Sequence, residues 1–349
     1  MQQDTAALRE TPIEFTGSGK EYFGIWIVNI LLTIVTLGIY SAWAKVRRRK
    51  YFYNNTLLDG SPFDYLARPV AILKGWLIAA AVLIAYKVSS DIYPAVSALI
   101  LLLIILITPW VVVRSMRFNL VNTSYRNVRF NFKKNYQGSA AVFLGWLAVT
   151  VLTAGLAFPY YFYRQKKFVL DNAGYAQDSF GLTELGKRFY LLFLKLAGIV
   201  VLFFLVLFGV AAAVGYGAAM AGIETESVSN VTGGVANFAT YLFMLLLFAY
   251  FEVRKNNLIW NHARLGQHRF KSEMKVWPMF LIYLTNLFAI VFSIGLLIPW
   301  AEIRTTRYRL QHTKMLVAQS LDGYVAERLD EQNALGDQLS EAFDIEIGL

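Results

Sequence analysis

Residues 36–55 read TLGIYSAWAKVRRRKYFYNN. Within this stretch an aromatic residue, Trp43, is followed four positions later by Arg47 and twelve positions later by Asn55. The same order returns four more times along the chain, ahead of strand-like residues. A phrase that recurs at fixed offsets indicates one structural unit built several times.

The five copies share an aromatic residue, an arginine four positions later and a polar residue at the twelfth position. The aromatic residues are Trp43, Trp110, Tyr160, Tyr250 and Trp300, and the arginines are Arg47, Arg114, Arg164, Arg254 and Arg304. The polar residues are Asn55, Asn122, Asn172, His262 and His312. Eight residues further on stand Phe63, Phe130, Phe180 and Phe270, whereas the last copy has Ser320.

Composition indicates a membrane protein. The chain is 57% hydrophobic and 16% charged, whereas about a quarter of the residues in a soluble domain are charged. Several apolar runs reach the roughly 20 residues that a membrane-spanning helix needs. They are continuous rather than alternating, which excludes an outer-membrane barrel. The fold class predicted is a mainly α, polytopic helical bundle with internal repeats and short cytoplasmic β-hairpins.

Apolar segments follow the order single, pair, single, pair, single. The seven segments are 23–43, 69–87, 94–113, 139–161, 191–214, 236–252 and 277–301. Each single segment carries Thr or Ser two positions before a glycine, at Thr36/Gly38, Thr153/Gly155 and Ser293/Gly295. We expect residues 1–320 to form the integral membrane domain. Residues 321–349 hold eight acidic residues and one basic residue, and they are expected to form an acidic cytoplasmic tail.

After each motif, aromatic and apolar residues alternate with period two, which is typical of a half-buried strand. The predicted hairpins are 50–66, 117–132, 167–182, 257–272 and 307–320. A lone hairpin is marginal in water, so five on one face can associate into a sheet or a barrel-like cap. The N-terminal Ile13–Phe15 resembles the second strand of a hairpin and is predicted to pair with the last copy.

Positive charge sets the expected topology. Every motif is basic, and Lys and Arg near segment ends stay in the cytoplasm. Seven ordinary spans would place at least one basic motif outside. We therefore favour paired segments that span and single segments that enter the membrane, break at the Thr/Ser-x-Gly turn and return. Seven spans remain the alternative.

Candidate site residues fall into two groups. The repeated arginines Arg47, Arg114, Arg164, Arg254 and Arg304 are candidates to face anionic lipid headgroups or an anionic solute; the alternative is an aromatic belt with arginines reaching the interface. Asn29, Thr33 and Asn286 are candidates for the wall of a polar cavity. The Asn and His residues at the twelfth position either form a polar ring or satisfy local backbone near a turn.

Several classes of function are not expected. The net charge of +10 is concentrated at the ends of apolar runs, which favours anionic lipids over nucleic acid as the partner. The chain has no cysteine, and its three histidines lack acidic partners at ligand spacing, so neither a metal site nor a cofactor is expected. We find no acid–base pair or nucleophile, and hence expect no enzyme. No ionisable residue falls at mid-segment, which argues against a proton-coupled pump.

The segment Thr36-Leu37-Gly38-Ile39-Tyr40-Ser41-Ala42-Trp43-Ala44-Lys45-Val46-Arg47, preceded by Phe15-x-Gly17 and Glu21-Tyr22-Phe23, resembles the YjgN family of bacterial inner-membrane proteins. The likeness covers nearly the whole chain, although the third and fourth copies have Tyr160 and Tyr250 in place of Trp. The resemblance implies a multi-pass protein of the bacterial inner membrane. It implies no activity and transfers no catalytic residue.

The expected function is therefore a membrane protein that passes a small solute, as a transporter or channel. The alternative is a scaffold or lipid-interacting protein at the cytoplasmic face. A homo-oligomer is compatible with either. A transporter should show a polar cavity with Asn29 and Asn286 on its wall, whereas a scaffold should show a tightly packed interior.

Overall fold

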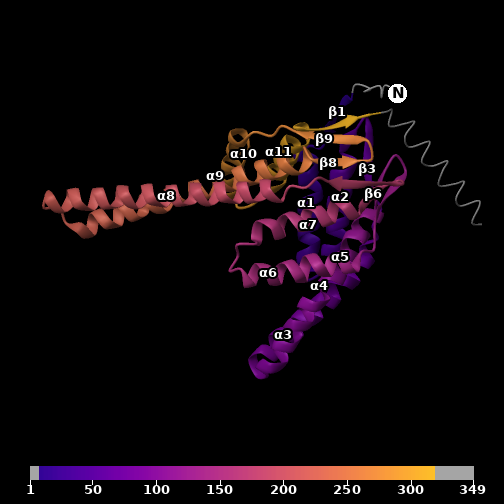
Figure 1. Cartoon of the computed structure of the whole chain (residues 1–349), viewed down its shortest axis with the longest axis horizontal. Coiled ribbons are helices and arrows are strands. Elements are labelled where there is room, and N and C mark those ends of the chain that lie inside the picture. The colour runs from indigo at the N-terminus through magenta and orange to yellow at the C-terminus, as the bar shows by residue number, and fades with distance from the viewer. Residues whose placement is uncertain (1–7, 319–349) are drawn as a thin grey trace, which may run out of the picture.

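A computed structural model of the chain describes residues 8–318, and its central feature is a closed antiparallel barrel of ten strands (Figure 1). The strands are β1 (Arg9–Phe15), β2 (Thr56–Leu58), β3 (Ser61–Tyr65), β4 (Thr123–Tyr125), β5 (Val128–Phe132), β6 (Ala173–Tyr175), β7 (Asp178–Leu182), β8 (Ala263–Leu265), β9 (His268–Ser272) and β10 (Thr313–Val317). The predicted fold class, a helical bundle with separate short hairpins, is therefore wrong. Closure gives every strand two neighbours, which removes the exposed edges that isolated hairpins would leave.

All five junctions between neighbouring hairpins use equivalent inward-facing residues. The paired residues are Phe63–Tyr125, Phe130–Tyr175, Phe180–Leu265, Phe270–Met315 and Ile13–Leu58. These ten side chains belong to one hydrophobic cluster inside the barrel. Ile13 thus occupies the place that phenylalanine holds in the other four junctions.

The N-terminal strand closes the barrel. Strand β1 does pair with the last copy, but through Arg9–Pro12 rather than through the predicted Ile13–Phe15; Arg9 lies opposite Val317 in β10. Its second half, Ile13–Phe15, pairs instead with β2. Ser320, the expected inward residue of the last copy, lies outside the described residues. Strand β1 therefore serves as the second strand of the fifth hairpin.

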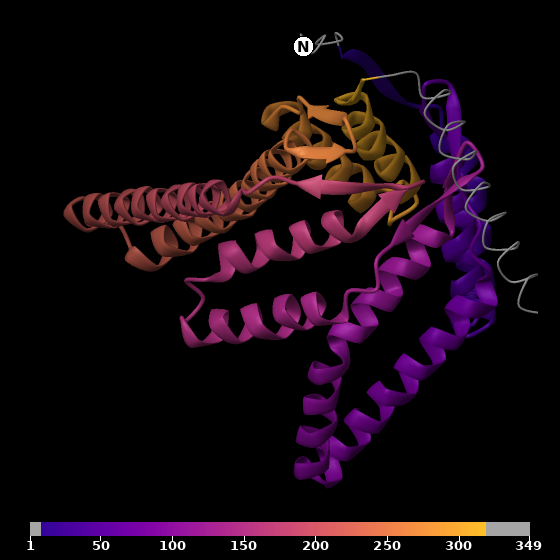
Figure 2. The ribbon, with the colours of Figure 1, turned by 45° about the vertical axis from the view of Figure 1, so that its right-hand side comes forward.

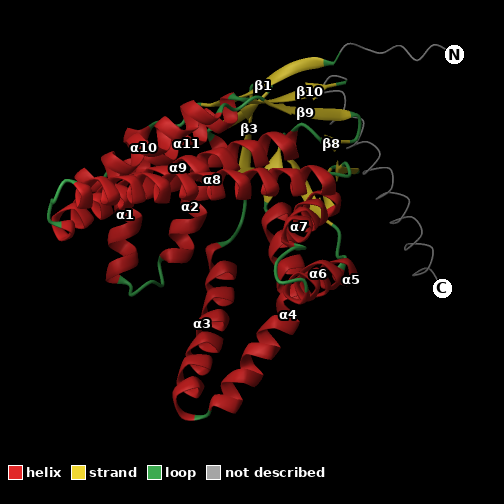
Figure 3. Ribbon diagram, turned by 60° about the vertical axis from the view of Figure 1, so that its left-hand side comes forward, coloured by secondary structure: helices red, strands yellow, loops and turns green. Residues whose placement is uncertain are grey.

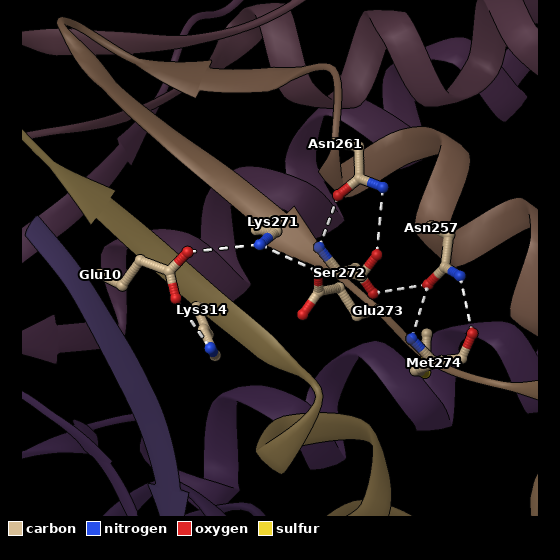
Figure 4. A network of polar contacts seen from close by, with 8 residues as sticks. All are labelled: Glu10, Asn257, Asn261, Lys271, Ser272, Glu273, Met274 and Lys314. Atoms are coloured by element: carbon tan, nitrogen blue, oxygen red, sulfur yellow. Dashed lines mark hydrogen bonds and ion pairs between the residues drawn. The ribbon is translucent and has the colours of Figure 1, made fainter. Parts of the chain in front are cut away.

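An ion-pair network joins β1 to its neighbours on the outer surface (Figure 4). Glu10 accepts from Lys314 of β10 at 2.8 Å and from Lys271 of β9 at 3.3 Å. Lys271 also lies 2.9 Å from Glu273. The two lysines hold the pKa of the Glu10 carboxyl below its usual value through hydrogen bonds and charge attraction. Three strands that are far apart in sequence are thereby linked.

The single apolar segments are helix–turn–helix pairs, and the predicted breaks are present. The first pair is α1 (Gly19–Val35) and α2 (Ser41–Asn54); the last is α10 (Val276–Phe292) and α11 (Ile298–Gln311). In the middle, α5 (Tyr136–Ala140), η1 (Ala141–Gly145) and α6 (Trp146–Leu152) run in succession and turn into α7 (Phe158–Asn172). None of the three segments is a straight rod through its glycine.

Each break is a compact turn whose backbone groups are satisfied by the chain itself. Gly38 has φ +91° and its N–H donates to the Thr33 carbonyl at 2.8 Å, as in a helix-ending Schellman motif. The hydroxyl of Thr36 accepts the N–H of Tyr40 at 2.9 Å, at the start of the returning helix. In the same way, the Thr153 hydroxyl accepts the N–H of Ala157 at 3.1 Å, and the Ser293 hydroxyl accepts the N–H of Leu297 at 2.9 Å. This explains the Thr/Ser-x-Gly spacing, because the hydroxyl and the left-handed turn each satisfy backbone groups that the helix ends leave without partners.

The paired segments form two long helical hairpins. Within residues 8–318, four helices are long and apolar enough to span a membrane: α3 (Pro69–Ile92), α4 (Pro94–Val121), α8 (Gly186–Met220) and, from Glu226 onward, α9 (Thr225–Trp260). The α3–α4 and α8–α9 hairpins leave the barrel in different directions (Figure 2). At most 11% of the residues in each membrane-length stretch are buried. The predicted bundle of spans is therefore absent from the described chain.

The boundary between helix and strand also differs from the prediction. Helix α2 continues to Asn54, and the first strand of its hairpin begins at Thr56 rather than at Lys50. The alternation of Tyr51 and Tyr53 belongs to a helical turn. Because the helix is held by packing of Tyr51 and Phe52 against α1 and β1, tertiary contacts outweigh the period-two pattern.

Every helical pair leaves the barrel and returns to it, so all five motifs lie on helices that end at the barrel. The strands gather in one region and the helices extend away from it (Figure 3). Motif helices α2, α4, α7, α9 and α11 each lead directly into a barrel strand. This arrangement agrees with the expectation that the basic motifs share one face.

Candidate functional site

A cavity of about 1180 Å³ lies between the first and last helix–turn–helix pairs, with α9 contributing one wall. We call it the interhairpin cavity. It is lined from α1, α2, α9, α10 and α11. Helices α1 and α10 run away from the barrel while α2 and α11 return to it, so the depth of each lining residue follows from its position in the helix.

The lining changes character along this depth. Near the turns the wall is apolar, with Ile34, Ile290 and Ile298. At the barrel end it is basic, with Arg48, Arg49 and Arg309. The cavity is therefore amphipathic: its end near the turns is apolar, and its end near the barrel is positively charged.

The three residues predicted for a polar cavity, Asn29, Thr33 and Asn286, all lie on this wall. Asn286 is 6% exposed, and its Nδ2 donates to the Ala301 carbonyl at 3.3 Å and to Thr305 Oγ1 at 3.1 Å. Its Oδ1 has no partner within the described chain. The Thr33 hydroxyl donates a hydrogen bond to the Asn29 carbonyl at 2.6 Å. The three predicted residues therefore share one wall, in which the Asn286 amide oxygen lies buried.

The charged residues of the wall were not singled out by the sequence. Arg48 donates to Glu302 at 3.1 Å, and Glu302 also accepts from the Tyr22 hydroxyl at 2.9 Å. Arg309 donates to Tyr283 Oη at 2.8 Å and to Glu252 at 3.4 Å.

The available sequence signal is the basic run that follows Arg47. It places Arg48 and Arg49 on helix faces next to that of the repeated arginine, and these faces turn toward the cavity. Arg309 has no such signal, since no other copy has a basic residue nine positions after its aromatic residue.

The five repeated arginines are not brought together. They lie on five different helices, and none lines the interhairpin cavity. Arg114, Arg254 and Arg304 lie over the rings of their own aromatic partners, at 4.9, 5.5 and 5.1 Å from the ring centres. Arg47 instead donates to Asn29 Oδ1 at 3.4 Å. The pairing of aromatic residue and arginine is thus largely local to each helix end.

The polar residues at the twelfth position satisfy local backbone. Each bonds through its side chain to the carbonyl four residues earlier. The side-chain distances are 2.8 Å at Asn55, 2.7 Å at Asn122, 2.8 Å at Asn172, 2.9 Å at His262 and 2.8 Å at His312. Of the two sequence hypotheses, the structure supports helix termination rather than a polar ring. Within residues 8–318, no group of three His, Asp or Glu side chains could hold a metal.

A second cavity, of about 580 Å³, occupies the inside of the barrel; we call it the barrel cavity. Its lining is dominated by aromatic and aliphatic side chains. Tyr125 Oη donates to the Leu58 carbonyl at 2.7 Å, and Tyr175 Oη donates to the Tyr125 carbonyl at 2.9 Å. Burial raises the pKa of both tyrosines, so their hydroxyls remain protonated donors. These two tyrosine hydroxyls are therefore used in hydrogen bonds within the barrel wall.

Comparison with known proteins gives one family and a small set of relatives. The family model described as "Bacterial protein of unknown function (DUF898)" matches residues 10–342. The chain is 38% identical over 123 residues to "Inner membrane protein YjgN" of Salmonella typhimurium, which is 34% of this chain and 30% of that protein. It is 33% identical over 126 residues to the protein of the same name from Escherichia coli K12, which is 36% and 31% of the two chains.

The matched region thus covers about a third of each of these curated relatives. No solved structure matches the chain. The relatives' names and the four candidate spans agree that this is a multi-pass protein of the bacterial inner membrane.

Proposed function

This chain belongs to the family described as "Bacterial protein of unknown function (DUF898)", and we propose that it binds the anionic headgroup of a membrane lipid in the interhairpin cavity, at the cytoplasmic face. The proposal gives the chain no catalytic step. It rests on one observation: a cavity that is apolar at its membrane end and basic at its barrel end.

The charge balance of the wall supports an anionic ligand. Lys45, Arg48, Arg49 and Arg309 line the cavity together with a single acid, Glu302. Arg48 is the one that pairs with Glu302, whereas Lys45 makes no ion pair within the described chain. Arginine and lysine side chains of this kind bind phosphate oxygens through charge-assisted hydrogen bonds. The surplus of positive charge therefore favours a phosphate-bearing headgroup.

The order of the lining residues matches a lipid in its ordinary orientation. Hydrocarbon chains would lie against Ile34, Ile290 and Ile298, in the direction of the bilayer. The headgroup would lie at Arg48, nearer the barrel, with Lys45 on the same helix closer to the turns. Basic residues at the cytoplasmic surface are also attracted by the negative potential of anionic lipids. No reorientation of the lipid is required.

Transport of a small solute is the second candidate, and one observation favours it: Asn29, Thr33 and Asn286 share one cavity wall. Against it, the four candidate spans are almost entirely exposed. A path across the bilayer needs helices that pack around it, because polar groups at membrane depth must be lined by protein or water. Residues 8–318 of a single chain offer no such enclosure of the four candidate spans, so lipid binding is the better-supported function.

Lipid binding can be measured on the full chain in nanodiscs that contain phosphatidylglycerol in a phosphatidylcholine background. We compare a Lys45→Gln/Arg48→Gln double variant with an Arg264→Gln/Arg269→Gln variant. The control removes the same charge from exposed positions on the barrel. Native mass spectrometry then counts the retained anionic lipids.

We expect the cavity variant to retain phosphatidylglycerol at least about tenfold less tightly, since each charge-assisted hydrogen bond contributes about 1.5–3 kcal/mol. The control should behave as wild type. Equal retention by both variants would contradict the proposal.

A further inference from the structure

We propose that the barrel cavity is a second binding site, which takes a single hydrocarbon chain whose anionic end lies at the opening beside Arg309. This goes beyond headgroup binding in the interhairpin cavity and rests on the barrel interior, with Arg309 at the boundary that the two cavities share. The ligand class is a single-chain anionic amphiphile, whose anion is either a carboxylate or a phosphate.

The first observation is the apolar space itself. Four phenylalanines, Phe63, Phe130, Phe180 and Phe270, form a row around the inner wall, with neighbouring ring centres 6.3, 6.4 and 6.1 Å apart. All four are only partly buried although they point into the barrel. Water finds few hydrogen-bond partners in an apolar cavity, so such a cavity stays dry and binds apolar ligands. A volume near 580 Å³ falls in the range of small-molecule sites, about 300–1,000 Å³.

The second observation is the interruption of this row. The fifth equivalent position holds Ile13, opposite Leu58. Isoleucine fills less of the interior than the phenylalanine of the other four junctions. Both Ile13 and Leu58 line the barrel cavity. The N-terminal strand therefore contributes to the free space in which a chain is accommodated.

The third observation is the opening. Phe52, Tyr53, Thr306 and Arg309 line both the barrel cavity and the interhairpin cavity, so the two spaces adjoin at these residues. The proposed route of the hydrocarbon chain from the membrane side into the barrel passes this shared boundary. The aromatic rings of Phe52 and Tyr53 flank this route, which favours an elongated ligand over a bulky one.

The charge at the opening fixes the polar end of the ligand. Arg309 is the one charged side chain among the residues that line the barrel cavity in the described chain. Its Nε is buried and has no hydrogen-bond partner within the described chain. Its Nη2 donates hydrogen bonds to Tyr283 and Glu252. A carboxylate or phosphate placed at this opening would meet the guanidinium, as such groups do elsewhere.

The test uses amphiphiles that carry a photoreactive diazirine near the end of the hydrocarbon chain. The full chain is held in phosphatidylcholine nanodiscs and irradiated with either a diazirine fatty acid or the matching lysophosphatidic acid. The uncharged monoacylglycerol is the third probe. Mass spectrometry maps the labelled residues. The two anionic arms separate a carboxylate from a phosphate as the preferred group.

The expected result is label on inward-facing strand residues such as Phe130, Phe180 and Leu265, from one or both anionic probes and about tenfold less from the uncharged one. Label on α3, α4, α8 and α9 reports ordinary membrane partitioning, so it serves as an internal reference. Label confined to those helices would overturn the proposal. Equal barrel labelling by the uncharged probe would overturn the role of Arg309.

Matched variants make the test specific. Ile13→Trp fills the cavity, and Ile13→Phe is a milder change that the other four junctions already accommodate. Leu57→Phe adds an aromatic ring to the outward face of β2 as the control. Barrel label relative to helix label should fall about tenfold with Ile13→Trp, fall less with Ile13→Phe and stay unchanged with Leu57→Phe. Unchanged barrel label in both Ile13 variants would contradict the assignment.

Failure of this inference is distinguishable from failure of headgroup binding. Ile13→Trp should leave retention of phosphatidylglycerol intact, because Lys45 and Arg48 do not line the barrel cavity. Conversely, Lys45→Gln/Arg48→Gln should leave the barrel label intact. Each cavity is therefore tested by variants that spare the other.

Discussion

The backbone N–H of Thr16 donates to the carbonyl of Asn55 at 3.0 Å and so joins the N-terminal strand to the first helix-to-barrel junction. Four equivalent bonds connect the remaining neighbours around the ring. They run from Leu66 to Asn122 at 2.7 Å, Lys133 to Asn172 at 2.8 Å, Thr183 to His262 at 3.3 Å and Glu273 to His312 at 2.9 Å. The fifth unit is thus completed by residues from the opposite end of the sequence.

A rearranged chain tests this closure. Residues 9–16 are removed from the N-terminus and placed after Val317 through an Asn-Gly turn, because Arg9 and Val317 are already paired and this dipeptide favours two-residue hairpins. We expect a folded protein with near-wild-type stability, measured by detergent-resistant thermal unfolding. Deletion of residues 9–16 without the graft should leave one edge of β2 and one edge of β10 unpaired and cause aggregation. A graft no better than the deletion would contradict the assignment of β1 to the fifth hairpin.

Tyr175→Phe should destabilise the barrel by about 1 kcal/mol, the usual net value of an intramolecular hydrogen bond. The lost bond is the one from Tyr175 Oη to the Tyr125 carbonyl. Tyr216→Phe is the control, since Tyr216 is 70% exposed on α8. Chemical denaturation followed by barrel fluorescence provides the measurement. Identical midpoints for both variants would show that the tyrosine bond contributes no stability.

His268 should make the β8–β9 hairpin sensitive to acid. It is 1% exposed, its Nδ1 accepts the Ala318 N–H at 3.2 Å, and burial lowers its pKa while nearby Asp178 acts in the opposite direction. The neutral form is favoured in the folded state. Its contribution to stability is therefore complete above the unfolded pKa of about 6.5 and is lost as pH falls through the lower folded pKa.

Hydrogen exchange of the β8 and β9 amides, corrected for intrinsic rates, measures this effect. Protection should fall below about pH 6.5 in the wild type, the region in which an unfolded histidine gains its proton. His268→Gln should flatten the profile over the same interval. A profile that retains its slope in the variant would assign the acid sensitivity to another group.

Glu302→Gln should strengthen binding of anionic lipid by about two- to fivefold, the effect of removing one charge at an exposed ion pair. Glu302 offsets Arg48 at 3.1 Å, so its neutralisation leaves the interhairpin cavity more basic. Retention of phosphatidylglycerol in nanodiscs is the readout, and phosphatidylcholine is the neutral reference. Weaker retention would show that Glu302 positions the ligand rather than opposing it.

The repeated phrase allowed the helical breaks to be predicted from sequence. The last copy does pair with the N-terminal strand, but through Arg9–Pro12 and not through the predicted Ile13–Phe15. The Thr36/Gly38 spacing is informative because the hydroxyl and the left-handed turn each have a local backbone task. A sheet or a barrel-like cap of hairpins was expected, but its closure through the pairing of β1 with β2 was not predicted. It depends on bonds such as Thr16–Asn55 between distant units, and period-two patterns give strand faces without giving strand neighbours.

The site was predicted in part for similar reasons. Asn29 and Asn286 stand out because amides are costly in apolar helices. Arg309 and Glu302 do not, since each looks like an ordinary interfacial charge until α11 is placed beside α1 and α9. The five repeated arginines were candidates for a shared anion-facing surface, but they lie on five different helices, and three of them lie over their own aromatic partners. Repetition in sequence therefore predicted a common architecture better than a common site.

The central claim is that all five motifs face the cytoplasm while the single segments enter and return. Single cysteines in this cysteine-free chain can be probed in spheroplasts with a membrane-impermeant thiol reagent. The positions are Asp91 and Ser227 at the far ends of the long hairpins, Ile39, Leu156 and Leu296 at the turns, and Gln177 and Gln267 at barrel loops. We predict labelling at Asp91→Cys and Ser227→Cys alone, with the barrel positions becoming reactive after lysis. Labelling of intact spheroplasts at any turn or barrel position would contradict the account.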